Sequence, residues 1–88
     1  MKPVKTHTFN GTKYDIDLCG PIDGSCDSPF GGKPNIRICT DLKTQAGLES
    51  AIHESLHACF WAKSEEKVNQ TAKDIARFLQ RLGYRRVT

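Results

Sequence analysis

Two histidines and a glutamate lie within one five-residue stretch of the chain, His53-Glu54-Ser55-Leu56-His57. In a helix, a spacing of four residues places both imidazoles on one face, one turn apart. From there both ring nitrogens can reach a single metal ion at about 2.0–2.1 Å. Glu54 is rotated by about 100° around the helix axis, beside the metal, where it can take a proton from a water molecule. The H-E-x-x-H pattern therefore predicts a zinc site in which His53 and His57 are ligands and Glu54 is the general base.

A catalytic zinc ion needs a third protein ligand and keeps a fourth position open. The acidic residues downstream of the histidines are Glu65, Glu66 and Asp74. On a helical wheel, Glu65 is in register with the apolar positions of its predicted helix, so it faces the helix that carries the histidines. Glu66 lies on the polar outer face of the same helix. Asp74 lies between the polar and the apolar face, and farther from the start of the helix. We predict Glu65 as the third ligand, with Glu66, Asp74, His7 or a cysteine as alternatives.

Hydrolysis of a peptide bond at such a site also requires a donor that stabilises the tetrahedral oxyanion. The candidates in this sequence are His7, Tyr14, Arg37 and Tyr84. A two-residue turn at Asn10 would place His7 opposite Tyr14, on the inner face of a hairpin. For all four residues, a place in the core or on the surface is the plainer interpretation.

Two helices must position these side chains. The first should begin within residues 42–46 and end near Trp61, because apolar residues recur there at helical spacing. The second should begin after the N-cap Ser64 and end at Gly83. The apolar stripe of the first helix is Leu48, Ile52, Leu56 and Cys59.

The remaining elements should be strands. Asn10-Gly11 indicates a hairpin over residues 4–18, in which Tyr14, Ile16 and Leu18 alternate with polar residues. Residues 35–39 read as a short strand. Four glycines and three prolines within residues 19–35 predict a long loop, either functional or a plain surface excursion. We therefore expect an α+β fold: a three-stranded antiparallel sheet, made of the hairpin plus one strand, packed on two helices.

The composition indicates one small domain over residues 1–88. Hydrophobic residues make up 38% of the chain, so a bound ion could contribute to its stability. The four cysteines form no CxxC pair, which favours reduced thiols over a cysteine-based zinc ribbon. No segment is apolar enough to span a membrane, and the N-terminus lacks the apolar core of a secretory signal. We expect a cytoplasmic protein with no membrane partner.

The net charge of +3 reflects arginines near the C-terminus. Nothing in the chain resembles a DNA- or RNA-binding module, so a solvated basic tail is favoured over a nucleic-acid interface. The arginines in question are Arg77, Arg81, Arg85 and Arg86.

The HESLH helix, the strand before it and the acid-bearing helix after it resemble the HExxH zinc metallopeptidases, the zincins. More narrowly, residues 34–86 are similar to small zincin-like proteins encoded by phages and prophages, through the stretch PNIRIC…LESAIHESLHACFWAKSEEKVNQTAKDIARFLQRLGYR. The resemblance implies His53 and His57 as zinc ligands, Glu54 as catalytic acid and base, and a downstream acid, matching Glu65 by position. It also implies that residues 35–39 border the substrate cleft and that the host is a phage-infected or lysogenic bacterium.

Two functions follow from these residues. The first is a zinc-dependent peptidase that hydrolyses a peptide or protein substrate. The second is a non-catalytic, zinc-stabilised binding protein such as a phage accessory factor. The small size of the chain, which leaves no room for a second wall of a substrate cleft, favours the second. The chain also lacks the metzincin extension, because Phe60 and Lys63 stand at the positions of its glycine and third histidine.

Overall fold

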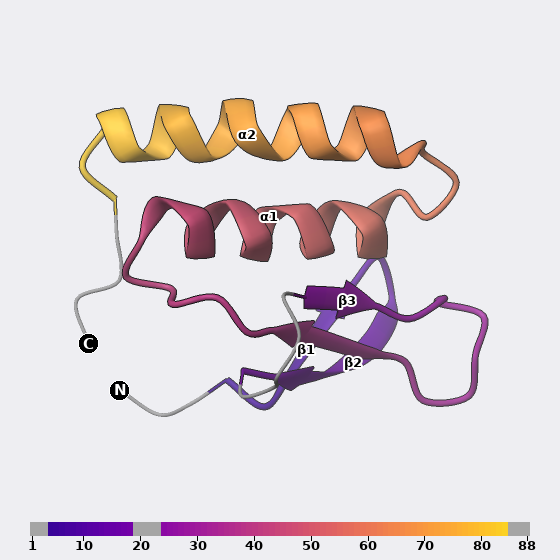
Figure 1. The fold of residues 1–88 in the computed structure, drawn as a ribbon. Helices are drawn as coiled ribbons and strands as arrows, with labels where there is room; N and C mark the ends of the chain where they lie inside the picture. The colour runs from indigo at the N-terminus through magenta and orange to yellow at the C-terminus, as the bar shows by residue number, and fades with distance from the viewer. Residues whose placement is uncertain (1–3, 19–23, 85–88) are drawn as a thin grey trace.

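The computed structural model describes residues 4–18 and 24–84. The start of the predicted loop at residues 19–23 and the basic residues Arg85 and Arg86 lie outside these ranges. The elements follow in the order β1 (Thr6–Phe9), β2 (Thr12–Asp17), β3 (Gly24–Cys26), β4 (Asn35–Ile38), α1 (Gln45–Cys59) and α2 (Glu65–Arg81). Figure 1 shows them in three levels, with α1 lying on the sheet and α2 lying on α1.

The hairpin forms as predicted. β1 pairs antiparallel with β2, with Phe9 opposite Thr12 and His7 opposite Tyr14. Asn10 and Gly11 both have positive φ, 49° and 84°, as a type I′ turn requires. The Asn10 side chain also donates a hydrogen bond of 3.0 Å to the carbonyl of Cys59. The turn thereby satisfies one of the carbonyls left unpaired at the end of α1.

The expectation of a three-stranded antiparallel sheet is wrong, although the α+β class with two helices holds. The sheet has four strands in the order β1-β2-β4-β3, and β2 pairs parallel with β4. The difference comes from β3, a strand of three residues inside the glycine- and proline-rich segment. β3 runs antiparallel to β4, so the chain reverses once more before β4 and arrives parallel to β2.

Both helices form where the sequence predicts them: α1 begins at Gln45 and ends at Cys59, two residues before Trp61, and α2 follows the predicted N-cap Ser64. The Thr44 hydroxyl accepts a hydrogen bond from the backbone N–H of Gly47, and the Ser64 hydroxyl accepts one from Lys67. Gly83 follows the C-cap Leu82 with φ of 89°, which is the left-handed conformation typical of the C′ residue after a helix. No helix within residues 4–18 and 24–84 is long and apolar enough to cross a membrane.

The core lies between α1 and the sheet. Its fully buried members are Tyr14 on β2 and Ile36 on β4, and Ala58 of α1 packs against them. Small residues face the sheet here, while Leu48 and Leu56 of the predicted apolar stripe line pockets shared with α2. α2 packs on α1 and contacts none of the described strands. These two leucines of the apolar stripe therefore lie on the side of α1 that faces α2, and not on the side that faces the sheet.

Candidate metal centre

The two histidines of α1 and the first residue of α2 form one cluster. The Nε2 atoms of His53 and His57 are 3.1 Å apart. Glu65 places Oε1 2.8 Å from His53 Nε2 and Oε2 2.7 Å from His57 Nε2. The histidine side chains are 18% and 14% exposed, while that of Glu65 is 71% exposed. The cluster is thus half-enclosed and open towards solvent on the side of Glu65.

A tight connection between the helices brings Glu65 into place. The Phe60 N–H donates to the carbonyl of Leu56 at 2.8 Å, and the Lys63 N–H donates to the carbonyl of Phe60 at 2.9 Å. Ser64 then caps α2 immediately, so α2 starts beside the last turn of α1. A carboxylate in the first turn of a helix is also favoured by the helix dipole.

The structure does not bring the other candidate third ligands to the histidine pair. Asp74 accepts a hydrogen bond from the Gln70 side chain at 3.1 Å, farther along α2. His7 packs against Phe9 on β1 with tilted rings whose centroids are 4.7 Å apart. Among the described residues, Glu66 and the cysteines are also outside the cluster. Glu65 is therefore the candidate that the fold favours, and its role as a ligand stays a prediction.

The cluster has the donor chemistry of a metal site. Two imidazole nitrogens and one carboxylate oxygen lie within 4.8 Å of one another. Ligand atoms at about 2.0–2.1 Å from a tetrahedral ion are about 3.3 Å apart. The separations of 2.7–3.1 Å between these atoms are close to that spacing. The residues present fit a metal ion with only small side-chain adjustments.

Glu54 lies beside the cluster and is only 7% exposed. Its carboxylate lies against the backbone of β3: a Cβ atom at Gly24 would be 3.0 Å from Glu54 Oε2 and 3.1 Å from Ser50 Oγ. Burial raises the pKa of the Glu54 carboxyl; His57 opposes this rise and Glu65 adds to it. The absence of a side chain at Gly24 is what allows β3 to approach the acid this closely.

Cys26 lies on the same side of the molecule as Glu54. Burial raises the pKa of its thiol to about 12, with the Glu54 carboxylate as the next contribution. Burial thus favours the neutral thiol form of Cys26, and its sulfur is not among the ligand atoms that gather at the histidine pair.

Two open grooves meet at Gly24, His53 and Glu54. One, of about 380 Å³, extends towards the C-terminal end of α1; the other, of about 450 Å³, extends towards its N-terminal half. The first is also lined by Ser25, Cys26, His57, Trp61, Lys63 and Glu65, and the second by Thr40, Ala46, Glu49, Ser50 and Asn69. Open space therefore lies on both sides of His53, and the first groove also reaches His57.

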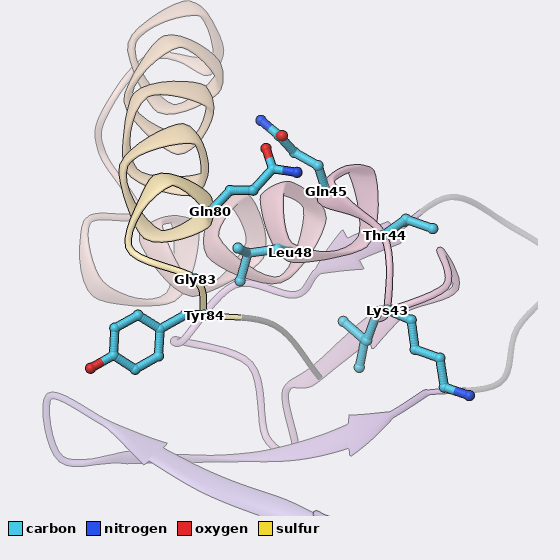
Figure 2. Close-up of a pocket in the computed structure, with 8 residues that line it drawn as sticks. Lys43, Thr44, Gln45, Leu48, Gln80, Gly83 and Tyr84 are labelled. Carbon is cyan, nitrogen blue, oxygen red and sulfur yellow. The ribbon is translucent and has the colours of Figure 1, made fainter. Parts of the chain in front are cut away.

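None of the four residues considered as oxyanion donors lines either groove. Tyr14 is fully buried in the core, and Arg37 donates hydrogen bonds to Ser25 and Asp27. Tyr84 lies at the C-terminal end of α2, where it lines a separate pocket of about 200 Å³ beside Leu48 (Figure 2). His7 stays on β1, at the opposite edge of the sheet from β3.

The strand that borders the cluster is also different from the one expected. β4, at residues 35–38, lies inside the sheet with β2 on one side and β3 on the other. β3 borders the grooves instead. Sequence reasoning missed Gly24, Trp61 and Lys63, because their positions depend on β3 and on the turn between the helices. Of these three residues, only Lys63 had a local sequence signal for its position, because it directly precedes Ser64, the N-cap of α2.

No protein-family model, curated protein or solved structure matches this chain. The resemblance to zincins, and the zinc ion that it implies, therefore stay predictions.

Proposed function

We propose that this protein is a zinc-dependent peptidase of the HExxH type. The observation that carries the proposal is the convergence of His53, His57 and Glu65 with the buried Glu54 beside them. Imidazole and carboxylate ligands in a compact set of three suit zinc better than magnesium or calcium, which prefer oxygen alone. A bound zinc ion would polarise the scissile carbonyl and activate a water molecule as the nucleophile.

Glu54 has the position of a general base. It neighbours His53 in sequence and lines both grooves, so its carboxylate is beside any substrate carbonyl held at the cluster. There it can accept a proton from the attacking water and pass it to the leaving amine. Glu65 and the two histidines would hold the ion, with Glu65 on the solvent-exposed side of the cluster.

The edge of β3 can hold the substrate backbone. The Asp27 N–H donates to the Asn35 carbonyl at 2.9 Å, which fixes the alternation of backbone bonds between β3 and β4. By that alternation Ser25 bonds towards β4, and the backbone groups of Gly24 and Cys26 point to the other edge. No described strand pairs with that edge. An extended peptide can add to it as a further strand, which would carry its backbone past the histidines.

One observation favours the alternative of a non-catalytic zinc-stabilised protein. α2 packs only on α1 among the described elements, and Glu65 is its first residue. A metal ion shared by the histidines and Glu65 would fasten α2 to α1 even if no substrate were cleaved. The two functions differ in whether Glu54 matters, because a structural ion has no use for a base.

The Glu54→Gln variant separates these functions. We expect the parent protein loaded with zinc to cleave members of a broad peptide library, detected by mass spectrometry, and the variant to bind zinc without cleaving. The matched control is Glu66→Gln, an exposed acid in the first turn of α2 that lies outside the cluster. Cleavage retained in Glu54→Gln contradicts the proposed mechanism. Zinc binding without cleavage by the parent supports the structural alternative.

A further inference from the structure

α2 carries exposed large apolar side chains beside the face that it packs against α1. The residues that it buries against α1 are Val68, Ala72 and Ala76. A second set at helical spacing, Thr71, Ile75, Phe78 and Leu82, follows one flank of the helix. Ile75, Phe78 and Leu82 are 36%, 60% and 56% exposed. These three large apolar side chains are therefore exposed.

This flank runs into a groove between the two helices. The groove has a volume of about 150 Å³, which suits one aliphatic side chain, and Phe60 at its border is 54% exposed. Apart from two lysines and Thr71 its lining residues are apolar, and no described acidic residue lines it. The lining residues are Leu56, Phe60, Lys63, Lys67, Val68 and Thr71.

We propose that this groove and the adjoining flank of α2 bind an acidic amphipathic helix of a partner protein. One apolar side chain of that helix would fill the groove, and those one and two turns away would cover Ile75 and Phe78. Its carboxylates would meet Lys63 and Lys67 at the groove border. The net charge of +3 on the chain would add long-range attraction for an acidic partner.

The lysines also argue against a second copy of this chain as the occupant. A two-fold dimer through this face would place the same lysine-bordered surface on both sides of the contact. Such a dimer would bring the two lysine pairs into one contact, and no described acidic residue lines the groove to neutralise them.

The test is a titration of the full chain into a fluorescently labelled synthetic peptide of about four helical turns. The peptide carries Leu at i, i+3, i+4 and i+7 and Glu at the other positions, and a control peptide carries Lys in place of Glu. We expect micromolar binding of the Glu peptide by anisotropy and none of the Lys peptide. Lys67→Glu should weaken binding about tenfold or more. Lys73→Glu makes the same charge change on α2 outside the groove, so it should leave the affinity within about twofold.

Three results would overturn the proposal. The first is that the Glu peptide does not bind. The second is that Lys67→Glu and Lys73→Glu lose the same amount of affinity for it. The third is that the parent protein sediments as a dimer and that Thr71→Glu dissociates this dimer. Circular dichroism of each variant establishes that it is folded. The proposal does not depend on a metal ion, so the titration is run both with and without chelator and should give the same affinity.

Discussion

The Glu65 carboxylate oxygen Oε2 lies 2.7 Å from Nε2 of His57, which joins the first turn of α2 to the last turn of α1. The contact is made by two residues eight positions apart, across the turn between the helices. Both residues also approach His53. The three side chains therefore meet at the N-terminal end of α2, where Glu65 contacts α1. The candidate metal centre and the contact between the two helices therefore share the same residues.

Replacing Glu65 should weaken metal binding. We expect Glu65→Ala to lower the zinc affinity by at least about tenfold, because two imidazoles alone make an incomplete ligand set. Competition with a chromophoric chelator measures the change. The matched control is Glu66→Ala, the neighbouring acid, which should bind zinc as the parent does. Equal losses in the two variants would mean that general negative charge, and not ligation by Glu65, supports binding.

Removing the metal should lower the thermal stability. An ion that binds only the folded chain stabilises it by about 3–4 kcal/mol when its free concentration is 100 to 1,000 times its Kd. We expect Tm to fall on addition of a chelator and to recover with zinc, as followed by circular dichroism. In the His53→Ala/His57→Ala variant neither addition should move Tm. A chelator response that persists in that variant would place the stabilising ion elsewhere.

Gly47→Ala should destabilise the protein although alanine favours helices. A Cβ atom at this position would overlap the carbonyl of Asp41, and that clash involves backbone which cannot easily move. We expect a loss of about 1–3 kcal/mol in the free energy of unfolding, measured with urea. Gly32→Ala is the control, because a Cβ atom there meets nothing within 4 Å. A stabilised Gly47→Ala protein would show that α1 does not approach residue 41 so closely.

The Asp27 carboxylate should give the protein a small pH-dependent stability. It accepts a 3.0 Å hydrogen bond from the Asn35 N–H, and this bond, with help from Arg37, lowers the pKa of Asp27 below 3.8. A lowered pKa stabilises the fold above pH 3.8, and the contribution is lost as the pH falls through the folded value. The side chain is 44% exposed, so we expect Asp27→Asn to cost less than about 1 kcal/mol at pH 7.

The difference between parent and Asp27→Asn should vanish at low pH, as measured by urea unfolding across the pH range. Asp15→Asn, an exposed acid on β2, serves as the control. A difference that stays constant down to the lowest pH at which the chain folds would contradict the assigned cause.

The hairpin and both helices could be predicted because short local signals determine them. Asn10-Gly11 favours the type I′ turn that forms. Ser64 precedes the first residue of α2 as its N-cap, and Gly83 follows its last turn. β3 could not be predicted in the same way. Three residues, Gly24-Ser25-Cys26, are too few for an alternating pattern, and they form a strand only because β4 lies alongside. Without β3, the parallel pairing of β2 with β4 was also out of reach.

The same division applies to the site. The spacing of His53 and His57, and the register of Glu65 on its helix, were sufficient to predict that the three would meet. The burial of Glu54 was not predictable, because it results from the approach of Gly24 on β3. Tyr14 was considered as an oxyanion donor, but strand alternation places it on the inner face of β2, where the core encloses it.

The most direct test of the metal centre is the metal content of the chain. The protein is purified without added metal and without an immobilised-metal column, and its ions are counted by inductively coupled plasma mass spectrometry. We predict about one zinc ion per chain in the parent and none in the His53→Ala/His57→Ala variant. A parent protein that holds no metal, even after incubation with zinc, would contradict the metal centre and the peptidase mechanism built on it.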